Sequence, residues 1–323
     1  MIRSITAGVI AVLLAVCGGA SAAKPARVAF LGAESPSTSR HFLEAFRVGL
    51  RERGYVEGRD IVIEERWAEG RSERFPDLAA EMVRLNVDVI VAVSTPAALA
   101  AKSATTVIPI VFIASDPLGS GVVSGLARPG GNMTGVSLAL GLEFTGKWLE
   151  LLREVIPRLS DVAVLWNPDN PANTGYLNAL QTAAQQLRVK LKPVGVREPG
   201  QIEGAFAAMA AARAQALVVL PDPLTVRYRD TIVARAAKAR LPAMYGFREF
   251  VNAGGLMAYG SSVSEICRRA ATYVDKILKG AKPGDLPVEQ PTSFQFVINL
   301  KAARALKLAI PPSLLQRADE VIQ

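Results

Sequence analysis

The chain has 323 residues, of which 50% are hydrophobic and 20% charged, so it can form two domain-sized cores and lacks the composition of a disordered protein. The 37 Lys and Arg residues outnumber the 29 Asp and Glu residues, but the excess is spread along the sequence, whereas nucleic-acid-binding proteins usually gather basic residues on one face. We therefore expect no nucleic-acid partner. With one His and two Cys residues, we also expect no zinc site, no iron–sulfur cluster and no catalysis by cysteine or histidine.

The first 23 residues have the pattern of a secretory signal peptide. Arg3 supplies a positive charge, residues 5–16 are apolar, and Ala20-Ser21-Ala22 is a small-residue cleavage site. The apolar run is shorter than the roughly 20 residues that span a bilayer, so we expect a soluble, exported, periplasmic protein. The run ending at Cys17 resembles a lipoprotein box, but Val16 stands where a small residue is expected, which favours cleavage over lipid attachment.

Short β-branched runs alternate with segments of helical periodicity along the rest of the chain, which predicts an α/β fold with two parallel-sheet units. A helical stripe over residues 144–155, ended by Pro157, separates the two units. The expected strands of the first unit are 27–31, 61–65, 87–93 and 108–113, and those of the second are 161–166, 191–196, 216–220, 243–247 and 256–259. The units resemble each other internally, since Ser35-Pro36 and Thr95-Pro96 in the first correspond to Asn170-Pro171 and Asp222-Pro223 in the second.

A polar residue followed by proline marks the end of several of these strands. The pairs are Ser35-Pro36, Thr95-Pro96, Asp116-Pro117, Asn170-Pro171 and Asp222-Pro223. Each pair by itself is typical of a helix cap, with proline in the first turn. Because the carboxyl ends of parallel strands share one edge of a sheet, several helix N-termini should converge there and favour a small carboxylate or other anion.

Several segments carry a family resemblance. They are residues 95–102, 108–112, 116–117, 126–135, 245–250, 286–292 and 297–301. Together they resemble the substrate-binding proteins of ABC transporters, in the tryptophan/tyrosine-type family. The resemblance implies the type I periplasmic-binding-protein fold, with two doubly wound parallel-sheet lobes and a ligand cleft between them. It places residues 24–138 and about 262–288 in the first lobe, and 139–260 and about 289–323 in the second.

The same resemblance implies a monomer without cofactor or metal, which captures a small polar or zwitterionic ligand by hinge closure and delivers it to a membrane permease with its ATPase subunit. An aromatic amino acid is one candidate ligand. Three crossovers are expected, near residues 137–142, 259–262 and 288–291.

Site residues follow from the resemblance, position by position. Those of the first lobe are Ser94, Thr95, Ser115 and Asp116, and those of the second are Asn167, Asp222, Tyr245 and Tyr259. Ser94, Thr95 and Ser115 are expected to hold the ligand carboxylate, while Asp222 receives its ammonium group across the cleft. Asp116 or Glu249 is the alternative acceptor for that group.

Two other functions fit the same features less well. An enzyme would need an acid–base pair or a nucleophile, and the carboxylates at strand ends, Asp116, Asp222 and Glu249, also fit capping or ligand-binding roles. We therefore expect a binding protein and no enzyme. The second alternative is an exported sensor that presents a bound solute to a membrane receptor, which would share every feature of the cleft.

Overall fold

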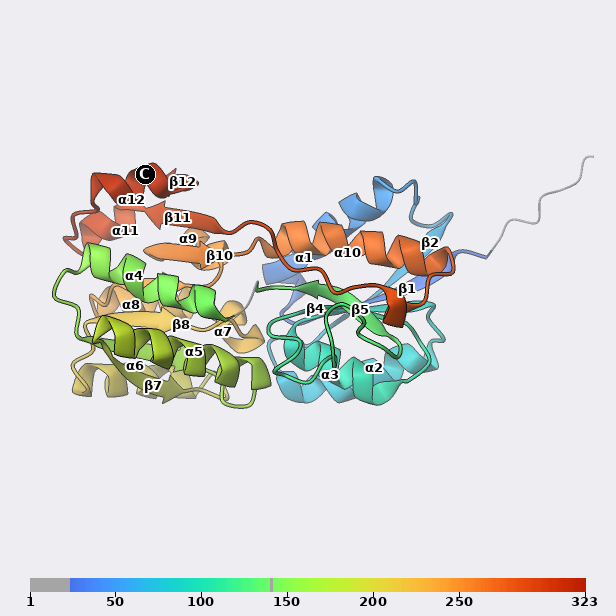
Figure 1. Ribbon diagram of the computed structural model, residues 1–323, viewed down its shortest axis with the longest axis horizontal. Helices are drawn as coiled ribbons and strands as arrows, with labels where there is room; N and C mark the ends of the chain where they lie inside the picture. Colours follow the sequence, from blue (N-terminus) through green and yellow to red (C-terminus); the bar gives the residue numbers. More distant parts are fainter. Residues whose placement is uncertain (1–23, 140–141) are drawn as a thin grey trace, which may run out of the picture.

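The computed structural model describes residues 24–139 and 142–323 and contains two α/β units, side by side along the long axis of the molecule (Figure 1). We call each sheet, with the helices packed on it, a lobe. The predicted signal peptide and Cys17 lie outside the described residues. Among the residues described, no helix is both long and apolar enough to cross a membrane.

Lobe 1 contains a five-stranded parallel sheet in the order β2-β1-β3-β4-β5. Its strands are β1 (Ala26–Gly32), β2 (Ile61–Trp67), β3 (Val89–Val93), β4 (Ile110–Ala114) and β5 (Met133–Ser137). Its helices from the first half of the chain are α1 (Pro36–Arg51), α2 (Phe75–Arg84) and α3 (Thr95–Ala104). The strands β3 and β4 are buried along their whole length, as expected for a parallel sheet covered on both faces.

Lobe 2 contains a seven-stranded sheet in the order β12-β11-β10-β9-β8-β6-β7. Its strands are β6 (Asp161–Trp166), β7 (Lys190–Gly195), β8 (Ala216–Val219), β9 (Ala243–Tyr245), β10 (Met257–Gly260), β11 (Gln295–Asn299) and β12 (Glu320–Ile322). Its helices are α4 (Gly146–Val155), α5 (Pro171–Leu187), α6 (Gln201–Ala211), α7 (Pro223–Arg227), α8 (Arg229–Lys238), α9 (Arg248–Asn252), α11 (Leu300–Ala305) and α12 (Pro312–Arg317). The strand order β7-β6-β8-β9-β10 repeats that of lobe 1, which confirms the two doubly wound sheets.

The sheets differ from the sequence-based expectation in three strands. Pro129-Gly130-Gly131 predicts a turn that extends over residues 132–134, but the turn ends at Asn132 and β5 begins at Met133. Periodicity does not predict the strands β11 and β12. The strand β11 runs antiparallel to β10, because the chain enters it from the neighbouring lobe and so begins at the edge where the parallel strands end.

The chain passes between the lobes three times, and the crossing segments are hydrogen-bonded to one another. The Ser261 hydroxyl donates to the Leu138 carbonyl at 2.8 Å, and the Ser137 N–H donates to the Glu289 carbonyl at 2.7 Å. Between the second and third crossings, helix α10 (Val263–Leu278) returns to lobe 1, where it packs lengthwise on α1 (Figure 1). Its apolar stripe buries Cys267 in the core, and this burial raises the pKa of the thiol.

Candidate functional site

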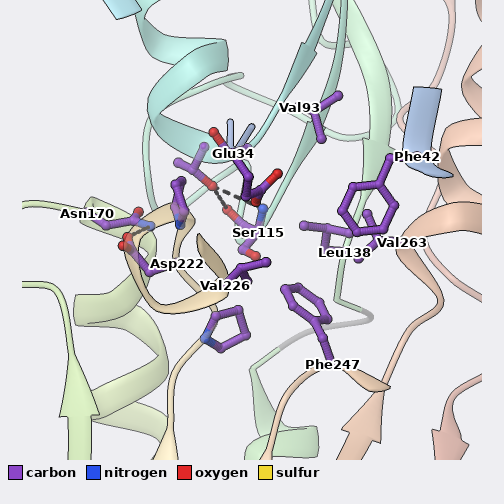
Figure 2. A pocket seen from close by; sticks show the side chains of 14 residues that line it. Glu34, Phe42, Val93, Ser115, Leu138, Asn170, Asp222, Val226, Phe247 and Val263 are labelled. Atoms are coloured by element: carbon purple, nitrogen blue, oxygen red, sulfur yellow. Dashed lines mark hydrogen bonds between the residues drawn. The ribbon is translucent and has the colours of Figure 1, made fainter. Parts of the chain in front are cut away.

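A pocket lies where the carboxyl ends of the strands of both sheets meet, and we call it the interlobe pocket (Figure 2). Its polar lining residues are Glu34, Ser94, Thr95, Ser115, Asn170 and Asp222. Its apolar lining residues are Phe42, Val93, Leu138, Pro221, Pro223, Val226, Phe247 and Val263. Glu34, Ser94 and Ser115 follow strands β1, β3 and β4, whereas Asn170 and Asp222 follow β6 and β8. Strand-end loops of an open parallel sheet are the usual place for a ligand.

On lobe 1, the predicted residues Ser94, Thr95 and Ser115 come together in the interlobe pocket. Ser94, not Thr95 as the proline position suggests, is the N-cap of α3, and its hydroxyl accepts the Ala97 N–H at 3.2 Å. The Thr95 hydroxyl donates to the Ser115 carbonyl at 2.9 Å and accepts the Ser115 N–H at 3.0 Å. These bonds fix the two strand ends to each other and leave the Ser94 hydroxyl hydrogen available to a ligand.

Ser94 has an uncommon backbone conformation for a residue with a side chain. Its φ is 120° and its ψ is 159°, a region that is populated almost only by glycine. Such a conformation costs about 1–3 kcal/mol and is frequent at functional sites, where the surrounding structure holds it in place. Here the Ser94 N–H is held by the Ile113 carbonyl and its carbonyl by the Ala98 N–H.

We expect the strain at Ser94 to increase the preference for glycine over alanine that an N-cap position already has. Both Ser94→Gly and Ser94→Ala lose the capping hydroxyl, but only glycine adopts φ 120° without strain. Ser94→Gly should therefore be more stable than Ser94→Ala by about 1–2 kcal/mol in urea denaturation. An alanine variant of equal or greater stability would show that the backbone is unstrained.

On lobe 2, Asp222 is the centre of a buried network and is only 3% exposed. Its Oδ1 accepts the Leu224 N–H at 2.9 Å, as the N-cap of α7, and the Asn167 amide at 3.2 Å, while Oδ2 accepts the Asn170 amide at 2.9 Å. Neither amide can turn freely, because the Asn170 Oδ1 accepts the Ala172 N–H and the Asn167 Oδ1 accepts the Asp169 N–H. Burial raises the pKa of Asp222 from 3.8 to about 6, although these donors oppose the shift.

The network has a consequence for substitution at position 222. A carboxylate offers about four acceptor positions, and three of those on Asp222 are already used inside lobe 2. An asparagine would keep the cap, but its amide nitrogen would face the Asn170 amide, donor against donor. Asp222 is therefore a structural centre of the site, and asparagine cannot replace it without cost.

Glu34 lies in the interlobe pocket, although neither the sequence pattern nor the family resemblance points to it. It is 6% exposed, and its Oε2 has no hydrogen-bond partner among the described residues. Burial raises the pKa of Glu34 from 4.5 to about 7, and the nearby Glu249 carboxylate adds to the rise while Arg229 opposes it. The signal was available: Glu34 directly precedes Ser35-Pro36, one of the strand-end pairs.

The raised pKa of Glu34 predicts a pH dependence of stability. A carboxyl whose pKa is higher in the folded state favours folding below its unfolded pKa, and this contribution is lost as the pH rises from about 4.5 through 7. The free energy of unfolding of the wild type should therefore fall by about 3 kcal/mol relative to Glu34→Gln across this range. Urea denaturation of both proteins at pH 4.5, 6 and 8 measures the difference, and parallel curves would contradict the shift.

The apolar lining forms the other half of the interlobe pocket. Figure 2 shows Phe42, Leu138, Phe247 and Val263 gathered on one side, away from Asn170 and Asp222. Phe42 and Val263 come from helices α1 and α10 of lobe 1, whereas Phe247 precedes α9 of lobe 2. None of the described lining residues is Lys, Arg or His. The pocket thus has an apolar half and a polar half whose ionisable side chains are carboxylic acids.

Four of the predicted site residues do not line the interlobe pocket. Asn167 lies directly behind it and donates to Asp222. Asp116 lines a separate small pocket; it begins a turn, not the predicted helix, because its Oδ1 accepts the Gly119 N–H and Gly121 has φ 75°.

The two predicted tyrosines lie elsewhere in lobe 2. Tyr245 is buried in the core, with its ring stacked on Phe250 at 4.6 Å between centroids. Tyr259 stacks on Phe294, at 5.6 Å, beside the third crossover. Both side chains have aromatic partners that account for their position.

Comparison with known proteins identifies relatives of this chain. Residues 34–322 match the sequence family described as ABC transporter substrate binding protein. A curated relative, the tyrosine-binding protein of Clostridioides difficile (strain R20291), is 26% identical over 266 residues, which cover 82% of this chain and 76% of the relative.

Two solved structures share the fold over nearly the whole chain. A conserved domain protein from Vibrio cholerae superposes with a TM-score of 0.87 at 29% identity, over 92% of this chain and all of that one. The ABC domain in complex with L-Trp from Streptococcus pneumonia superposes with a TM-score of 0.86 at 25% identity, over 93% of this chain and all of that one. The similarity therefore extends over both lobes.

Proposed function

The chain belongs to the family of ABC transporter substrate-binding proteins, and we propose that it captures an amino acid with an apolar or aromatic side chain for delivery to a membrane permease and its ATPase subunit. The family is one of ligand-binding proteins and not a class of enzymes. The ligand and the delivery partner are the parts of this function that need experimental identification.

The division of the interlobe pocket into a polar and an apolar half carries the proposal. An amino acid has an ionic head and a side chain, and the two halves of the pocket match these two parts. The Ser94 hydroxyl and the N-terminus of α3 suit the ligand carboxylate, because a helix N-terminus favours negative charge. Phe42, Phe247 and Val263 suit an apolar side chain. The names of two similar proteins, which bind tyrosine or hold L-Trp, support an aromatic amino acid.

We place the protein outside the cytoplasm, since the family is typically extracellular or periplasmic. In this proposal residues 1–23 are a signal peptide that is removed on export, and the mature protein acts as a monomer. The lobes consist of residues 24–138 with about 262–288 and of residues 139–260 with about 289–323. The site comprises Ser94, Thr95, Ser115 and Asp222, with Asn167 supporting Asp222 from behind.

Ligand entry in this proposal requires the lobes to separate. The space in the interlobe pocket is about 40 Å³, which corresponds to about three water molecules at roughly 10–15 Å³ each. An amino acid is larger than that. Because the lining comes from both lobes, rotation about the three crossing segments would open the pocket without unfolding either sheet.

A ligand screen tests the proposed function. The mature protein should be stabilised by one or more apolar or aromatic amino acids, because a ligand that binds only the folded state adds RT ln(1 + [L]/Kd), about 2.7 kcal/mol at a hundredfold excess. Thermal shift with the twenty amino acids, sugars and benzoate measures this, and isothermal titration calorimetry confirms the hits. A response to sugars alone would contradict the proposal.

Closure of the lobes is tested at Gly175 in α5, which contacts lobe 1 at Asp116. A Cβ atom added at Gly175 would lie 2.7 Å from the Asp116 Oδ2 and 2.9 Å from the Leu142 Cδ1. Gly175→Leu should hold the lobes apart and weaken the binding of the amino acid identified in the screen at least tenfold. It should also abolish the ligand-induced decrease in the radius of gyration, which small-angle X-ray scattering measures.

Gly204→Leu is the matched control. Gly204 is also a helical glycine, in α6, but an added Cβ would have no neighbour within 4 Å. In both variants leucine has a helix propensity about 1 kcal/mol more favourable than that of glycine, so the substitution should not destabilise the helix that carries it. Equal affinities of the two variants would show that the contact between Gly175 and Asp116 is not needed for binding.

A further inference from the structure

Glu34 is a buried acid, and one of its two carboxyl oxygens has no hydrogen-bond partner among the described residues. It is 6% exposed, lines the interlobe pocket, and its Oε2 accepts no hydrogen bond from the described residues. A buried charged group that lacks a partner is costly, so native structures rarely keep one without a function. An acceptor of this kind, on a residue that lines a pocket, indicates a donor that arrives with the ligand.

The groups around Glu34 do not supply that donor. The Ser39 hydroxyl lowers the pKa of Glu34, but it forms no hydrogen bond of ordinary geometry with the carboxylate. Arg229 is close enough to act on Glu34 through its charge, yet its guanidinium donates to the carbonyl oxygens of Val226 and Thr38. Glu249 carries a charge of the same sign and pairs with His41 at 3.6 Å.

Asp222, the acceptor expected from the sequence, differs from Glu34 in this respect. Three donors of lobe 2 already bind its two oxygens, and these donors also orient the loops after β6 and β8. A ligand ammonium would find one acceptor position at most on Asp222, whereas no described residue donates to the Oε2 of Glu34.

We propose that Glu34 accepts the ammonium group of the ligand and makes the protein select ligands that carry a basic nitrogen. This inference rests on the proposed function and specifies its ligand class. It also moves the ammonium from lobe 2 to lobe 1. Both ionic ends of an amino acid then bind to lobe 1, at Glu34 and at Ser94, while lobe 2 closes over the side chain with Phe247.

The test compares amino acids with analogues that lack the amine. The probes are L-tryptophan with indole-3-propionate and L-tyrosine with 3-(4-hydroxyphenyl)propionate, titrated by calorimetry into wild type, Glu34→Gln, Asp222→Asn and Glu64→Gln. The ratio of the two Kd values within a pair isolates the contribution of the amine, because a general loss of pocket shape weakens both members. Glu64 is the control acid: it belongs to lobe 1, pairs with Arg27 at 2.8 Å and does not line the pocket.

We expect wild type and Glu64→Gln to bind the amino acid about 10- to 100-fold more tightly than its analogue, because a charge-assisted hydrogen bond contributes an affinity difference of this size. In Glu34→Gln this ratio should fall below threefold, with the melting temperature unchanged or higher. In Asp222→Asn the ratio should persist even if both affinities decrease.

The outcomes separate this inference from the proposed function. If both wild type and Glu34→Gln bind the amino acid more tightly than its analogue, Glu34 does not accept the ammonium group. If only Asp222→Asn loses this preference, the acceptor is Asp222. Equal binding of both members by wild type would overturn an ammonium site while leaving ligand capture intact. If wild type binds none of the four probes and the amino-acid screen is negative, the inference and the proposed amino-acid ligand fail together.

Discussion

The parallel pairing of the strands is the constraint on which the pocket depends. In a parallel sheet every strand ends at the same edge, so the residues that follow β1, β3 and β4 lie together in lobe 1, and those that follow β6 and β8 lie together in lobe 2. The two sets face each other across the interlobe pocket. Hydrogen bonds then hold these strand ends in place: those between Thr95 and Ser115 in lobe 1, and those that Asp222 accepts in lobe 2. The site is thus assembled from segments that are distant in sequence and rigid in structure.

This dependence explains how much of the molecule could be predicted. Apolar periodicity locates nine strands, because buried parallel strands are continuous β-branched runs such as Val89–Val93. It fails at β5, where Pro129-Gly130-Gly131 suggests a turn, and at β11, whose direction depends on a crossover between the lobes that periodicity does not show. Local pattern therefore predicts the repeated unit of the lobes but not the strands that complete each sheet.

The candidate site, like the fold, could be predicted from the sequence in part. The rule that places ligands at strand ends finds Thr95, Asn170 and Asp222, and the family resemblance adds Ser94 and Ser115; all five line the pocket. It cannot distinguish an acid whose acceptors are satisfied, Asp222, from one whose acceptor is free, Glu34, because that difference depends on which donors the folded chain brings within reach. Tyr245 shows the opposite limit: it ends a strand, but its side chain packs on Phe250.

The return of helix α10 to lobe 1 has a consequence for how the chain folds. Arg268 on α10 binds Glu52, 216 residues earlier in the sequence, and α10 covers α1 along its length. During synthesis, lobe 1 therefore lacks one of its covering helices until most of lobe 2 has emerged. Contacts of such long sequence separation form slowly. Until α10 packs on it, α1 therefore keeps its apolar face exposed to solvent. The protein should depend on a chaperone, or on remaining unfolded until release, more than its two compact sheets would suggest.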